Sequence, residues 1–234
     1  MHHALDVLAL EEGALLEGQD AQETAVLRAV AQWSRDYLTR PHPAVGRTGA
    51  VCPWVEKSIQ QRLYHLTLLP EAHLRMEEAE RTLLLLLNHF LEMPPTVFRQ
   101  GQFKAIVTIF NGLPGELEAE FISGLHDRLR PAFVKQGLML GEFYPSCVKT
   151  GLHNRDWYPL RSSPPLLVIR SMVRPDIAFL HTHEEFVQAY LGKHQQEGCT
   201  ELRNYIARNR EHLAPGNVSM LEETLLKFQQ AKGG

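Results

Sequence analysis

The most informative part of this chain is the segment from Gly141 to Arg161, which gathers several residue types that could carry out chemistry. The segment is rich in Gly, Pro, Asn, Trp, Tyr and Arg and has neither helical nor strand periodicity. A long irregular segment inside a compact domain is usually functional, because its backbone polar groups need partners that a helix or sheet would otherwise supply. Its one histidine, His153, follows Gly151, which lets the backbone approach a ligand. These features favour a ligand or cofactor site over a proline-rich surface loop with a chance histidine.

The surroundings of His153 suit axial ligation of a heme iron. One neutral imidazole nitrogen would bind the iron, and a hydrogen bond would orient the other. Arginine pairs with carboxylates through two hydrogen bonds, so nearby arginines are candidates for the heme propionates. Tryptophan and tyrosine would supply flat walls. The residues expected to hold heme b are His153 as the metal ligand and, around it, Arg161, Arg170, Arg155, Tyr144, Trp157, Trp54 and Asn154.

Cys52 is the rival iron ligand, since it also lies beside a proline and an aromatic residue. Thiolate ligation requires a lowered thiol pKa, whereas the apolar neighbours Val51 and Val55 would raise that pKa by desolvation. We therefore prefer His153 and expect Cys52 to pack in the core. An enzyme without a cofactor, with Cys52 or Cys147 as its nucleophile, remains an alternative.

A second group of possible ligands is His181-Thr182-His183-Glu184-Glu185, whose spacing resembles that of metal ligands. The group also introduces a predicted helix, where Thr182 would be the N-cap and Glu185 would complete a capping box. We favour the capping interpretation. The patterns GxGxxG, GxxxxGK[ST], HExxH and GxSxG are absent from the sequence, which argues against dinucleotide-binding, nucleotide-binding, zincin and α/β-hydrolase activities.

Composition narrows the class of partner. The chain has 234 residues, 44% of them hydrophobic, and a formal net charge of −3, so no electrostatic footprint for nucleic acid or an anionic membrane is present. The N-terminus lacks a secretory pattern, and the longest apolar run, Leu83 to Leu87, is too short to cross a bilayer. Three widely spaced cysteines form no CxxC pair. We expect a cytoplasmic protein that binds a small-molecule substrate; a homodimer is compatible with the sequence.

The elements that must position these residues are apolar strands separated by amphipathic helices. Strands are expected at 63–69, 103–110, 138–144 and 165–172, and helices at 21–39, 70–93, 114–136, 184–194, 200–212 and 219–232. This pattern predicts an α+β fold, in which a central, mostly antiparallel sheet is covered by helices and followed by a helical C-terminal segment. We expect a single domain over 1–234, with a loosely ordered arm at 1–20, a core at 48–192 and a helical extension at 193–234.

Several motifs together resemble an uncharacterised bacterial domain family whose members often occur in natural-product gene clusters. The motifs are Cys52-Pro53-Trp54-Val55, the strand from Phe103 to Phe110, Gly141-Glu142-Phe143-Tyr144-Pro145, Gly151-Leu152-His153-Asn154, Pro159-Leu160-Arg161-Ser162 and the strand from Leu166 to Val173. The resemblance covers about residues 48 to 192 and is most specific between 141 and 173.

More distantly, the Cys-Pro-aromatic motif and the Gly-Leu-His followed by Arg are similar to the YqcI/YcgG proteins, which include heme-dependent enzymes acting on amino-acid nitrogen. That family tends to have proline after Gly-Leu-His, where this chain has Asn154. The resemblance implies a heme-dependent oxidoreductase of specialised metabolism that oxidises or rearranges a small nitrogen-containing, amino-acid-derived substrate. The alternative is a cofactor-free binding protein for a pathway intermediate.

Overall fold

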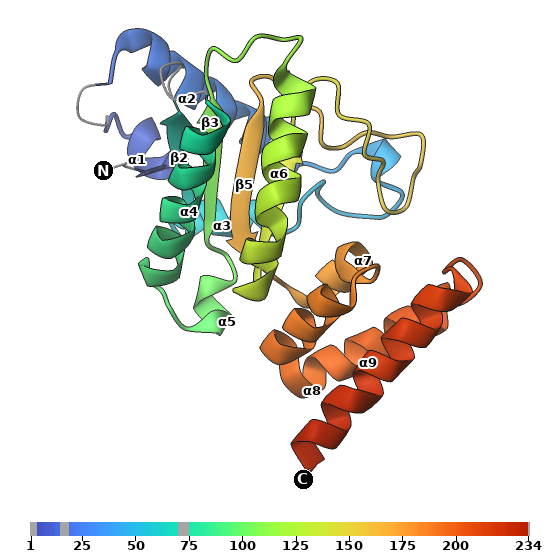
Figure 1. The fold of residues 1–234 in the computed structure, drawn as a ribbon. Coiled ribbons are helices and arrows are strands. Elements are labelled where there is room, and N and C mark those ends of the chain that lie inside the picture. Colours follow the sequence, from blue (N-terminus) through green and yellow to red (C-terminus); the bar gives the residue numbers. More distant parts are fainter. Residues whose placement is uncertain (1–3, 15–18, 70–74, 234) are drawn as a thin grey trace. The chain divides into compact units, whose positions relative to one another are not determined.

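The structure is a computed structural model that describes residues 4–14, 19–69 and 75–233 (Figure 1). These residues divide into two compact units. The first runs to Leu129 and resumes from Leu140 to Ser171, and the second takes Arg130–Met139 and the chain from Met172 onward. The second unit resumes at Met172, directly after the last strand, and the single domain with a core at 48–192 and an extension at 193–234 stays a prediction.

A five-stranded mixed sheet forms the centre of the fold, in the order β1-β2-β3-β5-β4. Its strands are β1 (Leu5–Asp6), β2 (Tyr64–Leu69), β3 (Ala105–Phe110), β4 (Leu138–Phe143) and β5 (Leu166–Ser171). β1 pairs antiparallel with β2, and β5 pairs antiparallel with β3. β2 and β3 are parallel to each other. Every residue of β3 is buried, as its β-branched and apolar sequence predicts for a central strand. The predicted α+β class is confirmed, and the sheet is mixed, with antiparallel pairing of β1 with β2 and of β3 with β5 and parallel pairing of β2 with β3.

Helices cover both faces of the sheet in the first unit. The helical elements of this unit are α1 (Val7–Glu11), α2 (Ala21–Trp33) with a π-helical continuation (Ser34–Leu38), a 3-10 turn (Pro43–Val45), α3 (Val55–Gln60), α4 (Met76–Glu92), α5 (Phe98–Gly101) and α6 (Glu118–Lys135). The residues of α6 from Arg130 onward belong to the second unit. Residues of α1, α2 and α3 share one core cluster with Leu66, Val107 and Ile109 of the sheet. Figure 1 shows α4 and the start of α6 over the opposite face.

Helices dominate the second unit, as the sequence predicts for the C-terminal part. A 3-10 turn (Arg174–Asp176) leads into α7 (Ile177–Leu180), α8 (Glu184–Asn209) and α9 (Pro215–Gly233). Non-helical dihedrals at Gln195 divide α8 into two helical parts, which agrees with the two helices expected at 184–194 and 200–212. Tyr190, Leu202 and Leu221 are fully buried and belong to the core of this unit. No helix within the described residues is long and apolar enough to cross a membrane.

Two local predictions are corrected. The arm expected at 1–20 contains a strand and a helix. The side chain of Asp6 caps α1 by accepting hydrogen bonds from the backbone N–H groups of Leu8 and Ala9, and Val7 and Leu10 are buried. Residues 1–3 and 15–18 lie outside the described part. The capping box predicted with Thr182 is wrong, because α8 begins one residue later, with His183 at the N-cap.

Lys104, at the entrance to β3, ties that strand to the end of α4. Its side chain is 4% exposed, and Nζ donates hydrogen bonds of 2.7 Å to the backbone carbonyls of both Phe90 and Met93. The last carbonyls of a helix have no partner within the helix, so this ammonium replaces the missing donors. Burial lowers the pKa of the Lys104 ammonium.

We expect Lys104→Met to lower the free energy of unfolding by about 1–3 kcal/mol, because two buried carbonyls lose their donor. Urea titration of the purified protein measures the change. Arg81→Met removes an exposed cation from α4 and is the matched control, with little expected effect. Equal stability of the two variants would show that Lys104 does not anchor the end of α4.

His194 makes the second unit sensitive to acid. The residue is 6% exposed, and the centroid of its ring lies 4.9 Å from that of Tyr190. The pKa of His194 is lowered from 6.5 to about 4, mainly by burial. Lys193 and Arg174 also lower this pKa, whereas Asp176 raises it. Between these two pH values the unfolded chain binds a proton at His194 that the folded chain does not bind. Stability is therefore lost as the pH falls through this window.

We expect His194→Gln to reduce the loss of unfolding free energy between pH 7 and pH 4.5 by on the order of 2 kcal/mol. Urea titrations at a series of pH values measure this slope. His212→Gln removes an exposed histidine of the same unit and should retain the wild-type slope. A wild-type slope in His194→Gln would contradict the assignment.

Candidate functional site

The irregular segment between β4 and β5 closes on itself through backbone hydrogen bonds. The N–H of Tyr144 donates to the carbonyl of Leu160 at 3.2 Å, and the N–H of Gly151 donates to that of Trp157 at 2.8 Å. These two bonds fold residues 144–160 into nested loops. A Cβ at Gly151 would lie 3.0 Å from the indole of Trp157, so a larger residue there would require Trp157 to shift. The segment thus has a defined conformation without belonging to a helix or a strand.

The turn at 42–46 supports the part of the segment that contains His153. Asn154 donates from Nδ2 to the carbonyl of Ala44 at 3.1 Å. Gly46 has φ +74, and a Cβ there would lie 2.9 Å from Cβ of His153, so this close approach requires glycine. The imidazole of His153 is exposed and makes no hydrogen bond or ion pair with the described residues. Its backbone is therefore fixed while its ring nitrogens remain available.

Aromatic side chains connect the irregular segment to neighbouring parts of the first unit. Trp157 stacks on His42, with ring centroids 5.2 Å apart and planes 9° from parallel. The hydroxyl of Tyr37 donates to the carbonyl of Pro159 at 3.1 Å, and burial raises the pKa of that hydroxyl. These contacts attach the segment to the π-helical end of α2 and to the turn that follows it.

The two arginines of the segment differ in their surroundings. Arg161 donates from Nε to the carbonyl of Cys147 at 3.1 Å, and its guanidinium carbon lies 4.2 Å from the ring centroid of Tyr158. Arg155 is exposed and has no ion pair among the described residues. Arg161 therefore braces the segment, and Arg155 is available to a charged ligand.

Two of the predicted heme-binding residues lie at the other end of the sheet. Trp54 packs against Phe103, which precedes β3, and Arg170 pairs in register with Ala105, the first residue of β3. The irregular segment instead joins β5 beside Phe110, the last residue of β3. A six-residue strand spans roughly 17 Å. The structure therefore brings Tyr144, Asn154, Arg155, Trp157 and Arg161 to the segment of His153 and separates Trp54 and Arg170 from it.

A buried polar cluster around Glu142 was missed by the sequence prediction. The carboxylate of Glu142 is 1% exposed and pairs with the ammonium of Lys149. Ser123 donates to its Oε2 at 3.0 Å, and Nδ1 of His126 lies 3.5 Å from its Oε1. Tyr144 completes the cluster, with its hydroxyl 3.1 Å from that of Ser123. The cluster links α6, β4 and the irregular segment.

The cluster fits a supporting role better than a chemical one. Its central carboxylate is fully buried and the side chain of His126 is 7% exposed, so a substrate would reach neither group directly. Burial raises the pKa of the Tyr144 hydroxyl; the hydrogen bond with Ser123 lowers it, and Cys147 and Glu142 raise it. The sequence contained a signal for this cluster, because Glu142 alternates with Leu138 and Leu140 on the inward face of β4. A carboxylate buried at such a position needs a charged or hydrogen-bonding partner.

Fold and site together define an α+β protein with an exposed histidine on a braced irregular segment. A family model described as a domain of unknown function, DUF6875, matches residues 27–205, and the chain belongs to this family. No curated protein and no solved structure matches the chain. Within the described residues, no group of three or more His, Cys, Asp and Glu side chains could bind a metal ion by itself.

We expect Lys149→Met to loosen the irregular segment, because the buried carboxylate of Glu142 would keep only Ser123 and His126 as partners. Since Lys149 is 48% exposed, a stability loss of about 1–3 kcal/mol is expected rather than the larger value of a fully buried pair. Hydrogen exchange of peptides covering 144–161 measures the loosening, through the bonded amides of Tyr144 and Gly151.

Arg155→Met is the matched control, because it removes an unpaired cation from the same segment. Exchange in this variant should equal that of the wild-type protein. Faster exchange in both variants would point to a general effect of charge, and unchanged exchange in Lys149→Met would show that the ion pair does not brace the segment.

Proposed function

We propose that this protein binds heme through His153 and uses it to oxidise or rearrange a small, nitrogen-containing, amino-acid-derived substrate in specialised metabolism. The observation that supports this proposal is the contrast between the fixed backbone and the unpaired ring at His153. Asn154, Gly46 and Gly151 restrain the chain around this residue, yet its imidazole has no partner among the described residues. A side chain presented in this way suits metal ligation, in which one ring nitrogen must remain unprotonated.

The residues near His153 fit heme in their chemistry. The imidazole would supply the iron ligand, Trp157 an apolar ring beside it, and Arg155 a cation for a propionate. Arg161 keeps N–H donors beyond the Nε–H that bonds Cys147, so it is a second candidate for a propionate. Tyr144 and Asn154 would not contact the heme themselves but fix the conformation of the segment. Trp54 and Arg170 are not part of this proposal.

The location of Cys52 favours His153 as the ligand. Cys52 packs against the core cluster that contains α2 and α3, and its backbone N–H donates to the carbonyl of Leu38 at 2.8 Å. Cys147 is completely buried. The cysteine side chains thus lie in packed surroundings, whereas the histidine is accessible to a planar ligand.

The substrate class rests on the resemblance to heme-dependent enzymes that act on amino-acid nitrogen. Bound heme would supply redox chemistry at an iron that the protein tunes through the axial ligand. The residues of this chain would bind the carboxylate of the substrate or of the cofactor with Arg155 and Arg161 and would keep the His153 ring oriented. Cys52, Cys147 and Cys199 are all free thiols, which is compatible with the reducing conditions of the cytoplasm.

We expect the protein, produced with an adequate heme supply, to show a Soret absorption band. His153→Ala should lose this band because it lacks the iron ligand, and His212→Ala, which removes another exposed histidine, should keep it. Absorbance spectra with a heme assay per polypeptide measure the outcome, and circular dichroism confirms that the variants are folded. Colourless wild-type protein would contradict the proposal and favour a cofactor-free binding protein.

A further inference from the structure

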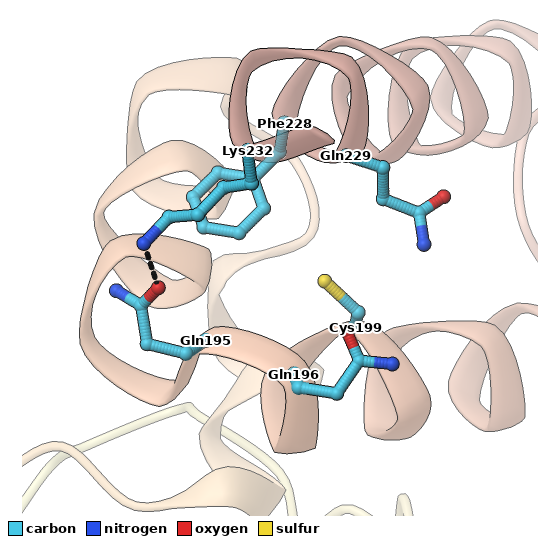
Figure 2. Close-up of a pocket in the computed structure, with 6 residues that line it drawn as sticks. All are labelled: Gln195, Gln196, Cys199, Phe228, Gln229 and Lys232. Atoms are coloured by element: carbon cyan, nitrogen blue, oxygen red, sulfur yellow. Dashed lines mark hydrogen bonds between the residues drawn. The ribbon is translucent and has the colours of Figure 1, made fainter. Parts of the chain in front are cut away.

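A hollow between α8 and α9, wholly within the second unit, is independent of the His153 segment (Figure 2). Its volume is about 390 Å³. It is lined by Gln195, Gln196, Cys199, Phe228, Gln229 and Lys232. The lining therefore combines three amides, one cation, one thiol and one aromatic ring, and contains no carboxylate.

The break in α8 shapes one side of this hollow. Gln195 has φ 51 and ψ −129, a conformation that residues other than glycine rarely adopt. Its side chain donates to the carbonyl of Gly192 and accepts a hydrogen bond from the ammonium of Lys232. Figure 2 shows Lys232 and Phe228 reaching from α9, with the sulfur of Cys199 directed toward the space between the helices.

The cation of this hollow is paired with a neutral group. Lys232 contacts the amide oxygen of Gln195 and lies 5.7 Å from the ring centroid of Phe228. The nearby acids of α8 are engaged elsewhere: Glu197 lies 3.7 Å from Arg174, and Glu201 lies 2.6 Å from Arg208. A carboxylate would be a stronger partner for Lys232 than an amide oxygen, because the hydrogen bond would join two charges.

The electrostatic surroundings of Cys199 also favour a negatively charged ligand. Burial raises the pKa of this thiol, while the positive charges of Arg203 and Lys232 lower it. The positive charges of Arg203 and Lys232 are therefore felt at Cys199, which lines the hollow. The amides of Gln196 and Gln229 lack side-chain partners among the described residues and can donate to the same ligand.

We propose that this hollow binds a small carboxylate that has a flat apolar part. The carboxylate displaces the amide oxygen of Gln195 from Lys232 and accepts hydrogen bonds from the amides of Gln196 or Gln229, and the flat part packs on the ring of Phe228. The site requires no metal and no residue of the first unit.

Titration with benzoate, followed by NMR of the side-chain amide groups, tests this site. In the wild-type protein the amide signals of Gln195, Gln196 and Gln229 should shift and reach saturation. Lys232→Met should weaken binding about tenfold, since a charge-assisted hydrogen bond is lost. Lys227→Met is the matched control on α9, because Lys227 lies 3.5 Å from Glu184 and does not line the hollow; it should bind as the wild type does.

Shifts that never saturate, or that are the same in Lys232→Met as in the wild type, would overturn the proposal. Gln229→Leu provides a second measurement if Lys232→Met is unstable, and should also weaken binding without affecting the Soret band. The result is independent of heme binding, because no residue of the hollow belongs to the segment of His153.

Discussion

Burying the carboxylate of Glu142 is unfavourable by several kcal/mol unless charges and hydrogen-bond donors surround it. The protein surrounds it with Lys149, Ser123 and His126, so that one carboxylate joins the irregular segment to α6 and β4. The segment lacks a ladder of its own, and its conformation follows from this cluster together with a few backbone bonds. An apolar residue at 142 would leave the ammonium of Lys149 without its partner in β4.

This arrangement separates the residues that support the irregular segment from the residues that we propose bind a ligand. Glu142, Tyr144, Asn154 and Arg161 use their polar groups within the protein, whereas His153 and Arg155 have no partner among the described residues. Supporting contacts of this kind keep a ligand residue within the narrow range of positions that binding requires. A chance histidine on a surface loop would have no need of the glycine at 46 or of the anchoring amide at 154.

The elements of the fold were predictable where the local pattern determines them. The apolar runs at 103–110 and 165–172 are strands β3 and β5 because each is buried along most of its length. The parallel pairing of β2 with β3 could not be read from either strand, since it depends on how α4 connects them. The sequence also could not show which of the residues expected to hold heme lie together: strand register places Arg170 opposite Ala105 at the start of β3, and Trp54 packs against Phe103, which precedes that strand.

A carbon-monoxide difference spectrum of the reduced, heme-loaded protein tests the proposal that His153 is the iron ligand. Imidazole ligation by His153 predicts a band well below the wavelength typical of thiolate-ligated heme. A band at roughly 450 nm would indicate a thiolate ligand and would contradict the assignment to His153.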